Sequence, residues 1–186
     1  MDSYRLFRSE RQDRQGGGTA LYVKEELDCT ALAVGNDMVE SLCVRIRGKS
    51  NKVDVVVGIY YRSPGQDGDT DVLFYMELRE ISRSVALVLM GDFNFTDVNW
   101  DCHTADTNRS RKFHVEDNLL AQVLKEPTRK SAFLDLLFVN RERLVGELKT
   151  GGCLGHSNHE VVKLQILGDR KKTASNTSTL MQGEQT

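Results

Sequence analysis

Polar side chains that could bind a metal ion or a phosphate follow an apolar stretch in the middle of the chain. Residues 85–90 (VALVLM) predict a buried strand, and residues 91–94 (GDFN) follow it directly. Side chains two positions apart at a strand end point to the same side, so we expect Asp92 and Asn94 to act together. A carboxylate beside an amide can hold hydrated Mg²⁺, or orient a water and a phosphate oxygen. The alternative is an ordinary turn, since Asp, Asn and Gly all favour turns.

Three other positions combine reactive groups with apolar strands. Residues 155–160 (GHSNHE) precede the last apolar stretch, where a histidine could serve as an acid or base, and a polar surface loop is the alternative. Asp135 lies inside residues 132–139 (AFLDLLFV). A buried carboxylate needs a partner, such as a histidine that it orients, unless Asp135 faces solvent at a sheet edge. Tyr61 ends an apolar stretch and could contact a phosphate or simply pack.

The elements that must position these groups are mainly strands. Hydrophobic patterning predicts strands at residues 19–23, 39–47, 53–61, 85–90, 132–139 and 159–167, and helices at residues 70–84 and 110–125. Loops are expected at residues 62–68 and 96–109. This order favours an α+β or α/β sandwich with sheets inside and helices outside.

Composition indicates one globular domain. The chain has 186 residues, 39% hydrophobic and 28% charged, with a net charge of −2. The nearly neutral balance argues against a general nucleic-acid binder, but not against an enzyme that grips DNA locally. We find no membrane-length apolar run and no apolar leader, and therefore expect an intracellular protein, nuclear or cytoplasmic, that is not secreted and has no membrane partner. Residues 1–167 form the expected domain, and the polar residues 168–186 an expected disordered tail.

Taken in order, these motifs resemble the endonuclease/exonuclease/phosphatase superfamily, which includes deoxyribonuclease I. The sequence around these motifs is similar to the endonuclease domain of vertebrate LINE retrotransposons of the chicken-repeat clade. The segments that carry the resemblance are GGGTALYV (16–23), YRSP (61–64), ALVLMGDFN (86–94), FLDLLFVN (133–140) and GGCLGHSNHE (151–160). Because several motifs match in order and spacing, the likeness is specific, and it covers residues 2–167.

The resemblance implies Mg²⁺-dependent hydrolysis of phosphodiester bonds in DNA, with no small-molecule cofactor. It implies a deoxyribonuclease I-like fold, a four-layer α/β/β/α sandwich that is partial here and lacks its first strands. Asp92 would orient or deprotonate the attacking water, and Asn94 would hold the scissile phosphate beside Tyr61. His159 would stabilise the pentacovalent phosphate, with its ring held by Asp135.

Two departures from the family pattern lead us to expect little activity. The family's main metal ligand is a Glu that precedes the segment matched by Met1. The family's Ser-Asp-His triplet reads Ser-Asn-His here, so Asn158 removes a charge beside the metal and the histidine. An active enzyme with another metal ligand is one alternative. A non-enzymatic module that binds nucleic acid or protein on the same fold is the other.

Overall fold

The computed structural model describes residues 3–9, 18–34, 37–95, 98–99, 104–107, 110, 120–128, 133–153 and 160–167. The first half holds strands β1 (Tyr4–Ser9), β2 (Thr19–Lys24), β3 (Cys29–Leu32), β4 (Glu40–Ile46) and β5 (Val55–Tyr61) and helix α1 (Gly68–Ile81). The second half holds strands β6 (Leu87–Asp92), β7 (Val98–Asn99), β8 (Thr104–Ala105), β9 (Ala121–Gln122), β10 (Asp135–Val139), β11 (Val145–Cys153) and β12 (Glu160–Ile166), with a 3₁₀ helix η1 (Glu142–Leu144). No helix among these residues is long and apolar enough to span a membrane.

The main sheet has six strands in the order β3-β4-β5-β6-β10-β9. Its pairs are antiparallel except β5–β6, which is parallel. Parallel neighbours need a long crossover, and α1 provides it. Two antiparallel ribbons, β1–β2 and β11–β12, and the short pair β7–β8 form three separate two-stranded sheets.

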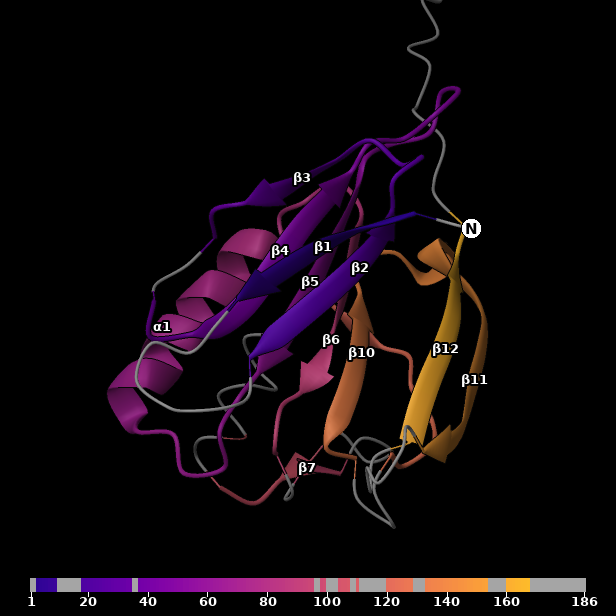
Figure 1. Cartoon of the computed structure of the whole chain (residues 1–186). Coiled ribbons are helices and arrows are strands. Elements are labelled where there is room, and N and C mark those ends of the chain that lie inside the picture. Colours follow the sequence, from indigo (N-terminus) through magenta and orange to yellow (C-terminus); the bar gives the residue numbers. More distant parts are fainter. Residues whose placement is uncertain are drawn as a thin grey trace, which may run out of the picture.

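Alternating side chains of the central strands bury both faces of the main sheet. On one face, one set packs with α1 around Phe74, and this first core also contains Tyr60, Leu89 and Phe138. On the other face, the second core contains Val57, Val88, Leu137 and Val139, packed against residues of β2, β11 and β12. Figure 1 shows α1 on one side of this sheet and the two ribbons on the other. The continuously apolar runs of β5, β6 and β10 follow from this double covering.

Helix α1 begins at a side-chain cap. The Asp67 carboxylate accepts hydrogen bonds from the Thr70 backbone N–H and hydroxyl, both at 2.8 Å. These bonds lower the pKa of Asp67, because they favour its ionised form. Phe74, Leu78 and Ile81 recur at the helical period and are buried against the sheet.

The α+β sandwich is confirmed, and so are the strands expected around β2, β4, β5, β6, β10 and β12. The helix expected at residues 70–84 is also confirmed and runs from Gly68 to Ile81. The stretch expected to be a loop, residues 96–109, contains the short paired strands β7 and β8. The helix expected at residues 110–125 is wrong for its last part. There, residues 121–122 form β9, which pairs with Phe138 and Val139 of β10. The sheet edge offered backbone hydrogen bonds that overrode the helical spacing. Residues 168–186 lie outside the described residues.

Candidate functional site

Three residues named from the sequence lie in one row across the main sheet. Tyr61 on β5 is the register partner of Asp92 on β6, and Asp92 is also the partner of Asp135 on β10. Directly opposed residues share a face of the sheet. The preceding rows on this face are apolar and belong to the second core, so the polar row ends an apolar surface.

A cleft of about 270 Å³ lies between this face and strand β12. Its walls are mostly apolar and include Ile59, Met90 and Leu137 from the main sheet and Val162 and Leu164 from β12. Two carboxylates, Asp135 and Glu160, also line the cleft. Asp135 is half-buried, so it is neither an exposed edge residue nor sealed in the core. An apolar cleft with a few carboxylates suits a ligand that binds through polar groups at one end.

The backbone departs from ordinary strand geometry on both sides of Asp92. Gly91 has a φ of +153° and approaches β5 so closely that a Cβ atom there would lie 1.7 Å from the Tyr60 carbonyl oxygen. Asn94 has a φ of +51°, in the left-handed region that Asn tolerates better than most residues. Strand β6 ends at Asp92, and residues 93–95 belong neither to a strand nor to a hydrogen-bonded turn. The expected joint action of Asp92 and Asn94 stays a prediction.

The Arg62 backbone forms hydrogen bonds with both Asp92 and Asn94. Its backbone N–H donates to the Asp92 carbonyl at 2.8 Å. Its own carbonyl accepts a hydrogen bond from the Asn94 side-chain Nδ2 at 2.9 Å. Arg62 was not singled out from the sequence. The available signal was an arginine directly after an apolar strand, in a position where its side chain could be buried.

Thr128 connects the start of β12 to Asp135. It is fully buried, and its carbonyl accepts a hydrogen bond from the Glu160 backbone N–H at 2.8 Å. Its hydroxyl accepts one from the Asp135 backbone N–H at 3.2 Å. Nothing in the sequence pattern indicated Thr128. His159 and Asn158, both named from the sequence, lie outside the described residues, so the expected contact of Asp135 with His159 stays a prediction.

A second polar cluster lies on the opposite face, under α1. Glu77, only 3% exposed, accepts hydrogen bonds from the Tyr60 hydroxyl at 2.7 Å and from the Ser41 hydroxyl. The Cys43 thiol contacts the Tyr60 oxygen at 3.9 Å. Burial raises the pKa of Cys43 to about 11 and also raises the pKa of Tyr60. Both side chains therefore stay protonated at neutral pH, and this cluster supports the fold rather than the cleft.

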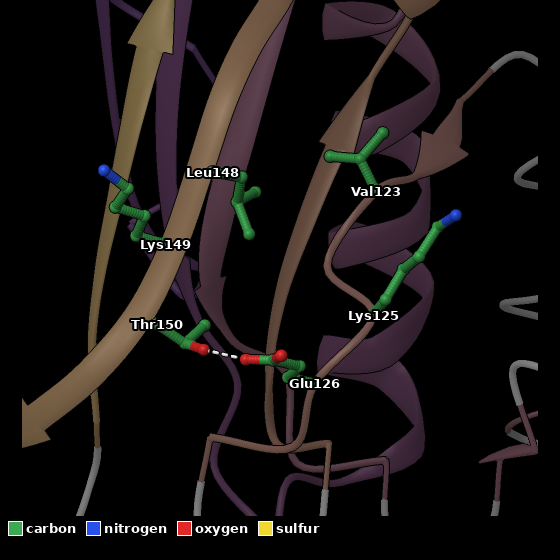
Figure 2. A pocket seen from close by; sticks show the side chains of 6 residues that line it. All are labelled: Val123, Lys125, Glu126, Leu148, Lys149 and Thr150. Carbon is green, nitrogen blue, oxygen red and sulfur yellow. Dashed lines mark hydrogen bonds between the residues drawn. The ribbon is translucent and has the colours of Figure 1, made fainter.

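A second hollow, of about 490 Å³, shares no lining residue with the cleft. It lies between the segment after β9 and strand β11, and Thr150 donates a hydrogen bond to Glu126 across it. Figure 2 shows Lys125 and Lys149 pointing away from each other. Because its charges do not converge, we place the candidate site at the polar row and not in this hollow.

The donor atoms of the row are hard oxygens, which are the ligands that Mg²⁺ prefers. Asp92 and Asp135 supply carboxylates from adjacent strands, and Asn94, which follows the row, carries an amide oxygen. Among the described residues, no group of three or more His, Cys, Asp or Glu side chains comes together as a metal site. The row thus offers Mg²⁺ two carboxylates of the preferred chemical type, without a complete ligand set among the described residues.

Solved structures share this architecture, although no family model and no curated protein matches the sequence. The endonuclease domain of TRAS1, a telomere-specific non-LTR retrotransposon, superposes with a TM-score of 0.68 at 18% identity, over 88% of this chain and 78% of that one. The chain has the endonuclease/exonuclease/phosphatase fold. An endonuclease/exonuclease/phosphatase family protein from Leptotrichia buccalis gives a TM-score of 0.58 at 16% identity, over 89% and 72%. The 3′ phosphatase NExo from Neisseria, solved with product DNA hairpin, gives a TM-score of 0.57 at 13% identity, over 88% of this chain and 79% of that one. At such identities, the likeness establishes this fold and leaves the activity to be argued from the residues.

Proposed function

We propose that this chain is the phosphodiesterase domain of a LINE-type retrotransposon endonuclease, that its substrate is DNA, and that its turnover is very slow. One observation carries the proposal: Tyr61, Asp92 and Asp135 stand side by side on one sheet face, and Asp135 also lines the apolar cleft. The nuclease and phosphatase neighbours of the same fold support DNA phosphate as the substrate class.

In this proposal, each residue of the row has a distinct task. Asp92 accepts a proton from the attacking water, whose oxygen forms a new bond to phosphorus as the bond to the leaving sugar oxygen breaks. Asn94 and Tyr61 hold the phosphate and the water in line. Asp135 orients His159, which stabilises the charge that builds up on the phosphate oxygens. The apolar cleft floor excludes water and strengthens these interactions.

Bound Mg²⁺ would supply positive charge to the phosphate oxygens. Asn158 is one cause of the slow turnover. In the family pattern that this sequence resembles, an aspartate stands at this position, and an amide has no charge to offer the metal or the histidine. Carboxylates around a metal ligand or its histidine typically contribute about 10- to 100-fold in affinity or activity. The Asn158→Asp substitution should therefore raise the rate by about that factor.

Nicking of supercoiled plasmid in Mg²⁺ or Mn²⁺ tests the proposal. The proteins to compare are wild type, Asp92→Ala, Asn158→Asp and the double variant Asn158→Asp/Asp92→Ala. Asp28→Ala is the matched control, because this exposed carboxylate pairs with Arg47 at the surface and lies outside the row. Gel-shift binding to the same DNA should be measured in parallel.

We expect wild type to nick at or barely above the Asp92→Ala background. Asn158→Asp should nick measurably faster, and removing Asp92 should abolish the gain. If Asn158→Asp brings no Asp92-dependent nicking although the protein binds the DNA, the proposed enzymatic function is wrong, and the chain is a non-enzymatic binding module on this fold. If wild type already nicks rapidly, the slow-turnover part of the proposal is wrong.

A further inference from the structure

The two residues proposed to handle water and phosphate share one backbone anchor. The Arg62 backbone N–H donates a hydrogen bond to the Asp92 carbonyl at 2.8 Å. The Arg62 carbonyl accepts one from Nδ2 of the Asn94 side chain at 2.9 Å. Asn94 is in a left-handed conformation, with φ of +51°, which costs energy for a residue other than glycine. Such a conformation persists only where surrounding contacts hold it. Arg62, directly after β5, provides the hydrogen bond to the Asn94 side chain.

The Arg62 side chain is itself rigidly held. It is 2% exposed, and its Nε and Nη2 atoms donate to the two Asp71 carboxylate oxygens at 2.9 and 3.1 Å. Its guanidinium carbon lies 4.4 Å from the centre of the ring of Phe95, the residue after Asn94. Gln66 adds a further hydrogen bond to Asp71 at 2.9 Å. A bidentate, stacked arginine has one orientation, which a lysine cannot reproduce.

These contacts form a continuous connection from α1 to the candidate site. Asp71 lies in the first turn of α1, and the Asp67 cap fixes that turn. The Arg62 side chain is therefore held by Asp71 of the helix, while the Arg62 backbone binds Asp92 and Asn94. Phe95 completes this set of contacts, because its ring packs on the Arg62 guanidinium and it directly follows Asn94.

We propose that Arg62 is a positioning residue that sets the side-chain amide of Asn94, with Asp71 and Phe95 as the groups that hold it. Since one Nδ2 hydrogen of Asn94 is directed to the Arg62 carbonyl, the Oδ1 atom occupies the opposite branch of the amide. Oδ1 then accepts from the attacking water, and the second Nδ2 hydrogen donates to a phosphate oxygen. The catalytic meaning of this orientation rests on the proposed function, whereas the orientation itself does not.

A buried ion pair could instead serve stability alone, and the test must separate these roles. Arg62→Lys and Asp71→Asn keep approximate size while removing the bidentate contact. Leu78→Ala is the matched control, because Leu78 lies on α1 in the first core and outside this set of contacts. It should lower the melting temperature without touching Asn94. Each variant is first confirmed as folded by circular dichroism.

The decisive readout is the side-chain NH₂ signal pair of Asn94 in ¹H–¹⁵N spectra, assigned by its loss in Asn94→Asp. We expect Arg62→Lys and Asp71→Asn to shift or broaden this pair, and Leu78→Ala to leave it in place. The positioning role is overturned if Arg62→Lys leaves the pair unmoved, or if Leu78→Ala moves it equally.

A kinetic readout then tests the catalytic meaning. In the Asn158→Asp background, Arg62→Lys should reduce kcat for plasmid nicking with little change in KM, because it disturbs orientation more than DNA binding. An unchanged kcat with a displaced Asn94 signal would show that the orientation has no catalytic role. If no variant nicks DNA, the proposed function fails, while the spectra still decide whether Arg62 sets Asn94.

Discussion

Replacing Gly91 with alanine should break the contact between β5 and β6 one residue before the polar row. A Cβ atom at this position would lie 1.7 Å from the Tyr60 carbonyl oxygen and 2.7 Å from its carbon. The obstacle is the main chain of the neighbouring strand, which has no rotamer by which to move away. The φ of +153° is in addition a conformation that side-chain-bearing residues rarely adopt.

The loss of stability follows from the clash of the added Cβ atom with Tyr60 and from the unfavourable φ at residue 91. An ordinary contact begins at 3.4 Å, so the strands must separate by about 1.7 Å at this position. Backbone strain of this kind costs about 1–3 kcal/mol, and forced repacking costs a similar amount. We therefore expect Gly91→Ala to lower the free energy of unfolding by about 3 kcal/mol. For a domain of this size, the melting temperature should fall by about 6–12 °C.

Thermal and urea denaturation followed by circular dichroism would measure this loss. Gly68→Ala is the matched control, since nothing lies within 4 Å of a Cβ atom there and alanine favours the first turn of α1. It should leave the melting temperature unchanged or raise it slightly. If Gly91→Ala melts together with wild type, the reasoning about the close approach of β6 to Tyr60 is refuted.

The polar cluster under α1 supports two further predictions. Tyr60→Phe removes a donor to the buried Glu77 and should cost about 2 kcal/mol of unfolding free energy in urea titrations, and an unchanged midpoint would contradict this role. The pKa of Cys43 is raised from 9.0 to about 11, so above pH 9 the unfolded chain releases a proton that the folded chain retains. Its stabilising contribution is therefore complete below pH 9 and is lost as the pH rises through about 11. The melting temperature should fall across this range, less steeply in Cys43→Ala, and a flat wild-type profile would contradict the assignment.

The sequence was informative wherever apolar patterning was strong. β5, β6 and β10 are buried on both faces, and their continuous apolar runs stand out for that reason. Strand β11 was missed because its glycines resemble a loop. Gly151 and Gly152 have positive φ values, and the pairing with β12 shifts register just there. Strand β1 was missed because its residues are largely exposed, so its pattern is weak.

The candidate site was predictable in its members and not in its assembly. Tyr61, Asp92 and Asp135 were named from separate segments, the resemblance implied that they act together, and the strand order makes them neighbours. The roles of Arg62 and Thr128 depend on hydrogen bonds between segments distant in sequence, which local patterning does not encode. The proposed partnership of Asp135 with His159 stays a prediction.

The division of the second layer into two separate ribbons has a consequence for how the molecule opens. Neither β1–β2 nor β11–β12 belongs to the six-stranded hydrogen-bonded sheet, so each is attached to it mainly by side-chain packing and by a few anchors such as the Glu160–Thr128 bond. Lifting one ribbon leaves the six-stranded ladder intact. Amide hydrogen exchange should therefore be slowest in β5, β6 and β10 and faster in the ribbons. Since β12 forms one wall of the cleft, such an opening would admit a large polymer to the polar row while the main sheet stays folded.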